Sequence, residues 1–296
     1  MSGREIALEI PHLHLAAREW GPVDGRPVLA LHGWLDNAAS FDRLAPLLPE
    51  LHVVALDLAG HGRSQHRPPG ANHHFIDWVS EIADAADALG WDRFSLLGHS
   101  MGAGLSSLMP AIFPERVQRM VLLEGAGPLS AAADRAPEQF ASALADEKKL
   151  KDSNARVFPD LKTAVAARAR DTELDLESSR LLVERGTERV DGGVRFTHDP
   201  RLKTRSRLRF TENQVRAFLS AISCPVLAVR ALEGWPFPED IVKARLAMIP
   251  DLEQVEVEGG HHVHLTHPER VAPVINRFFE LAGSEECFSP EGAEDF

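Results

Sequence analysis

No tyrosine occurs among the 296 residues of this chain, and only two cysteines are present, Cys224 and Cys287. The lack of tyrosine removes phenol groups from the candidate acids and bases. Cys224 begins an apolar, strand-like run, whereas Cys287 lies in the acidic C-terminal tail. We therefore expect no disulfide framework, and a reducing cytoplasm is the expected compartment.

Long apolar runs and an excess of basic charge are also missing. No run approaches the roughly 20 apolar residues that span a bilayer. The N-terminal segment, MSGREIALEI, lacks the pattern of a secretory signal. Lys plus Arg number 32 against 44 for Asp plus Glu, which gives a formal net charge of −12. Because nucleic acids and anionic membranes select basic surfaces, neither is an expected partner.

The sequence does contain a regular alternation of strand and helix patterns. Residues 5–19 alternate apolar and polar side chains around Pro11, which predicts an antiparallel hairpin. Four continuously apolar runs follow, each typical of a strand buried on both faces. These runs are 28–31, 53–56, 94–97 and 120–123, with helical patterns at 40–48, at 75–89 and from Met101. The order predicts an α/β fold with a mostly parallel central sheet flanked by helices.

The alternation stops at Gly125 and resumes about 90 residues later. Residues 128–215 show no buried-strand pattern and are rich in Ala, Leu, Arg and Glu, which predicts a mostly helical insertion. Strand patterns then return at 225–229 and 252–257, with helical patterns at 238–248 and 269–281. We expect a core made of residues 1–127 and 216–282, and an acidic, disordered tail at 283–296.

A candidate nucleophile lies in the run Gly98-His99-Ser100-Met101-Gly102, between a predicted strand and a predicted helix. This context is the one that a nucleophile elbow requires, because the serine must stand on a very sharp turn with its hydroxyl exposed. Only small residues fit two positions to either side, hence Gly98 and Gly102. The backbone N–H of Met101 would then face the developing oxyanion.

A serine nucleophile needs a base, and His261 is the candidate because it follows the last predicted strand. Three further histidines, His262, His264 and His267, lie in the same segment, and His262 is the alternative base. Crowded histidines also raise the hypothesis of a metal site. Since the segment has no companion cysteine or carboxylate cluster, we expect structural roles for His264 and His267 and no metal.

The acid that would orient the base has three candidates. Glu124 ends the strand that follows the helix of the nucleophile, and it is favoured because it too would reach the top of the sheet. Glu233 lies just past the strand at 225–231, and Asp240 lies further along. A strand-end carboxylate that only pairs with a neighbouring arginine is the structural alternative for Glu124.

The second oxyanion donor is expected in the loop after the first parallel strand, where Gly33 permits a close turn and the N–H of Trp34 would point into the site. A second glycine-rich loop, 57–64, lacks the spacings of phosphate-binding loops and is interpreted as a structural turn. Trp34, Trp235 and Phe237 lie in loops near the predicted site, where they would line an apolar pocket or pack between layers.

Several motifs together resemble the α/β-hydrolase superfamily, and the resemblance covers nearly the whole chain. They are His32-Gly33-Trp34, Asp57 with Gly60-His61-Gly62-Arg63-Ser64, the run 98–102 and Gly260-His261. More narrowly, further stretches are similar to the serine hydrolase-like proteins. These are His32-Gly33-Trp34-Leu35-Asp36-Asn37, Ser40-Phe41-Asp42-Arg43-Leu44, Arg185-Gly186-Thr187, Asp199-Pro200-Arg201-Leu202 and His261-His262-Val263-His264.

The resemblance implies a cap at 128–215 that roofs the pocket, and it is weak as to substrate because this fold hosts many activities. The commonest family pattern places an Asp after the strand 225–231, and that Asp is missing here. Some members place the acid where Glu124 stands, which supports Glu124. Family members with an aspartate nucleophile, the haloalkane dehalogenases and epoxide hydrolases, are disfavoured by Ser100.

We expect a serine hydrolase that acts on a small carboxylic ester, thioester or lactone through an acyl-enzyme on Ser100, with no metal or organic cofactor. Alternatives are a serine-dependent perhydrolase or transferase, a carbon–carbon bond hydrolase, or a ligand-binding protein without turnover. The basic residues at every second position of 201–209 either steer an anionic substrate or form a solvated face. The sequence is compatible with a monomer or a homodimer.

Overall fold

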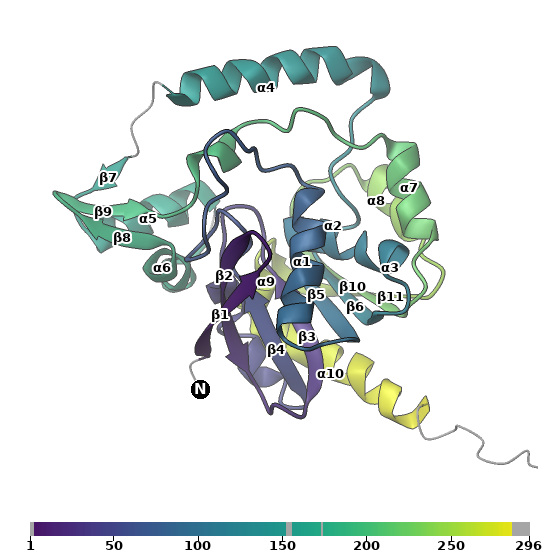
Figure 1. The fold of residues 1–296 in the computed structure, drawn as a ribbon. Helices are drawn as coiled ribbons and strands as arrows, with labels where there is room; N and C mark the ends of the chain where they lie inside the picture. Colours follow the sequence, from purple (N-terminus) through teal and green to yellow (C-terminus); the bar gives the residue numbers. More distant parts are fainter. Residues whose placement is uncertain (1–2, 152–155, 173, 286–296) are drawn as a thin grey trace, which may run out of the picture.

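A central sheet organises the computed structural model, which describes residues 3–151, 156–172 and 174–285 (Figure 1). Within these residues, eight strands pair in the order β1-β2-β4-β3-β5-β6-β10-β11. Six of these strands, β4, β3, β5, β6, β10 and β11, run parallel to one another, while β1 and β2 join antiparallel at one edge. The bounds are β1 Arg4–Ile10, β2 Leu13–Trp20, β3 Arg26–Leu31, β4 Leu51–Leu56, β5 Phe94–His99, β6 Val117–Leu123, β10 Val226–Glu233 and β11 Leu252–Gly260.

The parallel strands are buried on both faces, as their continuous apolar runs predict. In β3, Leu29 and Leu31 contribute to one core layer, and Val28 and Ala30 to the other. The first layer is covered by α1 (Asp77–Ala88), α7 (Glu212–Ser220) and α8 (Glu239–Leu246). The second is covered by the 3₁₀ turn η1 (Ala38–Phe41) and by α10 (Pro268–Glu285). The α/β-hydrolase architecture with helices on both faces is thereby confirmed.

Most predicted core elements are present, and the N-terminal hairpin pairs Arg4 with Glu19 and Ile10 with Leu13. The segment 40–48 differs, because it forms two short 3₁₀ turns, η1 and η2 (Ala45–Leu47), instead of one helix. Pro46 explains the difference, since it cannot donate the backbone hydrogen bond that a continuous helix needs at that position. Residues 286–296 of the predicted disordered tail lie outside the described residues.

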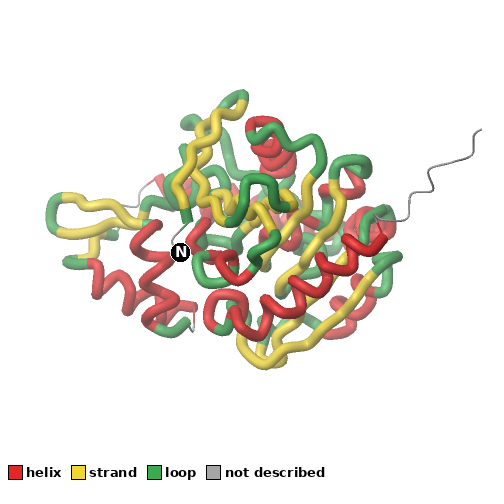
Figure 2. Tube along the Cα trace, turned by 90° about the horizontal axis from the view of Figure 1, so that it is seen from below, coloured by secondary structure: helices red, strands yellow, loops and turns green. Residues whose placement is uncertain are grey.

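The 128–215 segment contains α4 (Ala136–Lys151), α5 (Leu161–Thr172) and α6 (Leu176–Arg185). It also contains a small antiparallel sheet that the expectation of a mostly helical insertion did not include. Its strands are β7 (Val157–Phe158), β8 (Thr187–Val190) and β9 (Gly193–Phe196). Figure 2 shows the β8–β9 hairpin projecting at the side of the molecule. Its strands are only partly buried, so they lack the continuous apolar run that marks the core strands.

One buried ion-pair network fastens α6 to the central sheet. The Arg185 side chain is fully buried, and its Nε donates to both oxygens of Asp57, at 2.9 and 3.1 Å. Its Nη1 donates to Glu5 Oε1 on β1 at 2.6 Å. Asp57, which follows β4, also accepts the backbone N–H groups of Ala38 and Arg63. A single carboxylate therefore joins α6 to two loops of the core.

The helices offer no candidate for a membrane span: none that lies within the described residues is both long enough and apolar enough.

Candidate active site

Ser100 stands on the sharp turn between β5 and α2 (Met101–Ser106), with φ 52° and ψ −110°. This left-handed backbone conformation is strained for a residue other than glycine, and such strain collects at functional sites. A Cβ on Gly98 would lie 2.5 Å from the carbonyl oxygen of Gly102, and one on Gly102 would lie 2.0 Å from that of Leu31. Both glycines are thus required by packing, as the elbow motif predicts.

A chain of hydrogen-bonding contacts connects Ser100 to a base and an acid. His261, which follows β11, has its Nε2 2.9 Å from Ser100 Oγ. Its Nδ1 lies 3.2 Å from Glu124 Oε2. Because a carboxylate can only accept, the Nδ1–H of a neutral His261 donates to Glu124. The lone pair of Nε2 then faces the serine hydroxyl, which is the tautomer that a general base needs.

Glu124 follows β6 and is buried, with 7% of its surface exposed and a positive φ of 54°. Its two oxygens accept backbone N–H groups from the end of β10, from Ala231 at 2.5 Å and from Trp235 at 3.2 Å. These donors fix the carboxylate against His261. The other two candidate acids are exposed, Glu233 at the end of β10 and Asp240 on α8.

Gly234 is a site residue that the sequence analysis missed. A Cβ at this position would lie 2.1 Å from Glu124 Oε2, so any larger residue would displace the carboxylate. A glycine directly after Glu233, at the end of a predicted strand, was the available signal. The need for glycine at this position arises from its contact with the Glu124 side chain, which lies 110 positions earlier in the sequence.

The predicted oxyanion donors lie in the loop after β3 and at the start of α2. Trp34 follows β3 in a tight turn, in which the N–H of Asp36 donates to the carbonyl of Gly33. The indole Nε1 of Trp34 donates to the carbonyl of Leu202 at 3.0 Å, which ties this loop to the segment beyond α6. Met101 is the first residue of α2, so its N–H has no intrahelical partner.

The other histidines of the 261–267 segment have partners of their own. His264 is fully buried, and its Nε2 contacts Ser40 Oγ at 2.8 Å. The Nδ1 of His267 contacts Glu269 at 3.3 Å. His262, the alternative base, contacts Asp36 Oδ2 at 3.2 Å. It is His261, therefore, that the structure brings to the serine.

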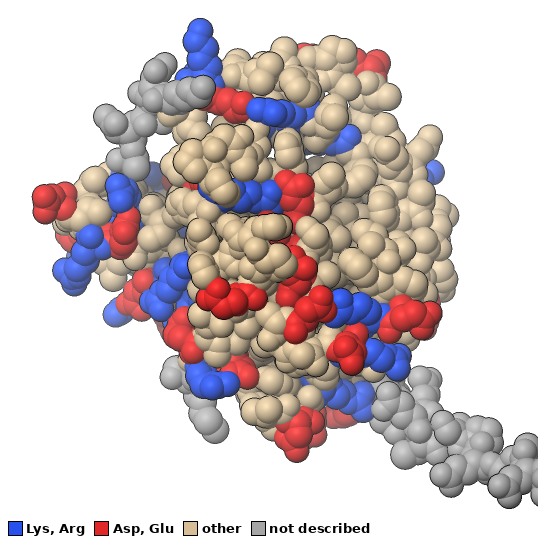
Figure 3. All heavy atoms as spheres, in the orientation of Figure 1, with Lys and Arg blue, Asp and Glu red and all other residues tan. Residues whose placement is uncertain are grey.

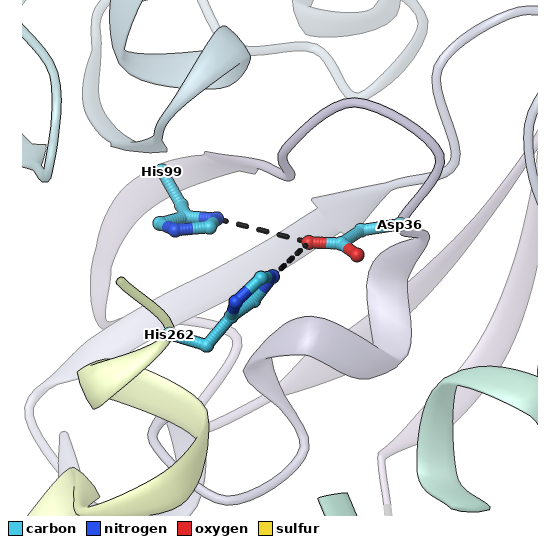
Figure 4. Close-up of side chains that lie close together, drawn as sticks. All are labelled: Asp36, His99 and His262. Carbon is cyan, nitrogen blue, oxygen red and sulfur yellow. Dashed lines mark hydrogen bonds and ion pairs between the residues drawn. The ribbon is translucent and has the colours of Figure 1, made fainter. Parts of the chain in front are cut away.

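Asp36 and His99 lie next to His262, as Figure 4 shows. Burial by itself would raise the pKa of Asp36, but His262 and Arg168 lower it well below its usual range. Burial lowers the pKa of His99 well below its usual range, and the adjacent His264 and His261 lower it further. The site thus keeps an ionised Asp36 beside a neutral His99.

Two exposed indole rings belong to loops that carry candidate site residues. Trp34 is 53% exposed and Trp235 is 61% exposed. The Trp235 ring lies with its centroid 5.6 Å from that of His261. Large exposed apolar groups near the candidate nucleophile are suited to contact an apolar part of a ligand.

The elbow serine, the histidine after the last strand and the buried carboxylate have the arrangement typical of an α/β hydrolase. A family model described as "alpha/beta hydrolase fold" matches residues 26–268. The chain belongs to this family.

Individual proteins similar to this chain include one curated protein and two solved structures. The chain is 33% identical to the serine hydrolase-like protein of Danio rerio, over 97% of this chain and 92% of that protein. A solved structure of a hypothetical protein from Pseudomonas aeruginosa PAO1 is 43% identical, with a TM-score of 0.90 over 95% of this chain and 99% of that one. A thioesterase domain from the curacin biosynthetic pathway is 26% identical, with a TM-score of 0.83 over 93% of this chain and 99% of that one.

Proposed function

We propose that the protein is a serine hydrolase that cleaves small carboxylic esters through an acyl-enzyme on Ser100. The observation that carries the proposal is the continuous path from Ser100 Oγ through His261 to Glu124, with separations of 2.9 and 3.2 Å. These distances lie within or close to hydrogen-bond reach, as nucleophilic catalysis by a serine requires.

In the proposed reaction, Ser100 Oγ attacks the ester carbonyl carbon while His261 Nε2 takes the hydroxyl proton. The carbonyl oxygen becomes an oxyanion, which the N–H groups of Trp34 and Met101 stabilise. The tetrahedral intermediate collapses, and His261 gives its proton to the departing alcohol. A water molecule, deprotonated by His261, then attacks the acyl-enzyme. The second tetrahedral intermediate collapses to the carboxylic acid, and His261 returns the proton to Ser100 Oγ.

Glu124 acts on His261 and not on the substrate. It fixes the Nδ1–H tautomer and stabilises the imidazolium that forms in each half-reaction. The exposed rings of Trp34 and Trp235 favour substrates with an apolar acyl group. The 128–215 segment, as a cap over this edge of the sheet, would exclude water and restrict the size of the substrate.

The test is labelling with a fluorophosphonate, which reacts with activated serines, followed by intact-mass measurement. Wild type is expected to gain one adduct, whereas Ser100→Ala and His261→Ala gain none. Ser107→Ala is the matched control, because Ser107 is a buried serine in the same region whose hydroxyl donates to the Gly104 carbonyl. It should label like wild type. Unlabelled but folded wild type would favour a ligand-binding protein without turnover.

A thioester is the second candidate substrate, favoured by the similarity to the curacin thioesterase domain. The same acyl-enzyme serves both substrates, since only the leaving group differs. Comparing kcat/KM for an oxygen ester and a thioester with the same acyl group separates the two.

Perhydrolase, transferase and carbon–carbon hydrolase activities would use the same serine. They are tested by adding peroxide, an alcohol or a β-diketone, respectively.

The basic run at 201–209 is not expected to select anionic substrates. Arg201 pairs with Asp199, Arg205 with Asp146 and Arg207 with Glu147. Figure 3 shows basic and acidic side chains lying next to one another on the face of the molecule that it presents. The double variant Arg205→Gln/Arg207→Gln should therefore change kcat/KM for a neutral and an anionic ester by the same factor. A selective loss on the anionic ester would restore the steering hypothesis.

A further inference from the structure

Three side chains from three separate loops converge beside the proposed catalytic histidine (Figure 4). Asp36 follows β3, His99 ends β5 and His262 follows β11. Asp36 Oδ2 lies 3.2 Å from His262 Nε2 and 3.8 Å from His99 Nδ1. All three ligand atoms lie within 4.8 Å of one another. Two imidazoles and a carboxylate form a donor set that transition metals prefer.

His99 presents an unused lone pair to this cluster. Its Nε2 lies 2.9 Å from the backbone carbonyl of His261, and a carbonyl can only accept, so Nε2 carries the proton. Nδ1 of the neutral ring is consequently an acceptor. It is buried and has no hydrogen-bond partner among the described residues. A lone pair that faces a carboxylate oxygen at 3.8 Å is an unfavourable arrangement, which a cation between the two atoms would relieve.

Two of the three separations between ligand atoms are close to those around a tetrahedral ion, and the third is at most 4.8 Å. Two ligands that each lie about 2.1 Å from a tetrahedral metal are about 3.4 Å apart. The two measured separations, 3.2 and 3.8 Å, fall on either side of this value. We propose that Asp36 Oδ2, His99 Nδ1 and His262 Nε2 bind a divalent transition-metal ion of the zinc type, separate from the proposed acyl-transfer machinery. On binding, the ion takes the place of the proton that His262 Nε2 donates to Asp36 Oδ2, and this proton is released to solvent.

Arg168 on α5 does not prevent this binding. It pairs with Oδ1 of Asp36 and leaves Oδ2 directed at the two histidines. Its charge offsets that of the carboxylate, but an anionic ligand is not essential for zinc, which some proteins hold with neutral imidazoles alone. The guanidinium and the His261 carbonyl then act as outer partners, which fix the orientation of Asp36 and the tautomer of His99.

The histidine segment itself contains no companion cysteine or carboxylate cluster, which is why the sequence predicts no metal there. The fold supplies a carboxylate from the loop after β3, and a second imidazole from the end of β5. Each ligand is one or two positions from a residue of the proposed machinery, Trp34, Ser100 or His261. A bound ion would therefore cross-link the three loops that carry this machinery.

The test is titration of tag-free, chelator-treated full-length protein with Co²⁺, followed by visible absorption, and with Zn²⁺ in a calorimeter. Wild type is expected to bind one equivalent with the absorption of a tetrahedral cobalt site, and Zn²⁺ should displace the cobalt. His262→Gln and Asp36→Asn should weaken binding by about 100-fold or more, since loss of even an outer partner costs about 10- to 100-fold.

Three control variants distinguish metal binding at this cluster from binding at neighbouring residues. His267→Gln removes a histidine of the same segment outside the cluster and should bind like wild type. Ser100→Ala and His261→Ala should also bind like wild type, which separates this result from the outcome of the serine labelling. Thermal unfolding in chelator verifies that His262→Gln is folded, even if Asp36→Asn is not.

Two outcomes would overturn the proposal. One is folded wild type that takes up no stoichiometric Co²⁺ or Zn²⁺, or that binds no more tightly than His262→Gln. The other is binding that is lost in His261→Ala and kept in His262→Gln, which would assign the ion to the proposed catalytic histidine.

Discussion

Glu124→Gln is expected to lower kcat for ester hydrolysis by about 10²-fold or more, as happens when the acid of a serine triad becomes an amide. The Glu124 carboxylate accepts from His261 and from the backbone N–H groups of Ala231 and Trp235. A glutamine replaces one accepting oxygen with an NH₂ group. Because Ala231 donates to Oε1 and the other two donors to Oε2, at least one N–H would face the NH₂ group in either orientation of the amide. In both orientations the imidazolium of His261 would lose the negative charge that stabilises it.

Glu233→Gln is the matched control, because Glu233 is an exposed glutamate at the end of β10 on the same edge of the sheet. It should keep kcat close to that of wild type. The measurement is steady-state hydrolysis of one ester by the three proteins, with circular dichroism to verify folding. The reverse ranking would move the acid to the end of β10, and equal small effects would remove both candidates.

Arg185→Met is expected to destabilise the folded state by about 3 kcal/mol or more, the usual cost of removing one partner of a buried ion pair. Asp57 has no exposed surface, so its carboxylate would lose the guanidinium without gaining water. The two remaining N–H donors, from Ala38 and Arg63, compensate only part of this loss. The readout is the midpoint of urea unfolding.

Arg180→Met on the same helix provides the comparison. Arg180 pairs with Glu184 on the surface of α6, and its side chain is 67% exposed. Since solvent screens such a pair, the urea midpoint should stay at the wild-type value. If Arg185→Met and Arg180→Met unfold alike, the buried network does not fasten α6 to the sheet.

Local patterns in the sequence predicted the core and much of the candidate site. The strand with Val28 and Leu29 was visible because a strand covered on both faces must be apolar throughout. Ser100 was visible because the elbow imposes glycines at fixed spacing. Glu124 and His261 were chosen because the ends of parallel strands meet at one edge. In the structure His261 contacts Ser100, and Glu124 contacts His261.

Features that depend on contacts between distant segments could not be predicted in this way. Gly234 owes its importance to a carboxylate on another strand, and Asp36 meets His262 only after β3 and β11 are placed in one sheet. The β8–β9 hairpin was missed for a different reason. Its strands are partly exposed, and the Asp191-Gly192 turn was its only strong local signal.

The exposure of the two indole rings gives the protein an optical property. Because the chain has no tyrosine, its near-ultraviolet fluorescence comes from its five tryptophans alone. Trp20 and Trp78 are buried in the two core layers, and Trp91 packs partly buried against the first of them, whereas Trp34 and Trp235 are exposed on loops of the candidate site. The Trp235 ring lies next to the imidazole that would gain a proton during the reaction. The long-wavelength part of the emission therefore arises largely at the site, and the core contributes the rest.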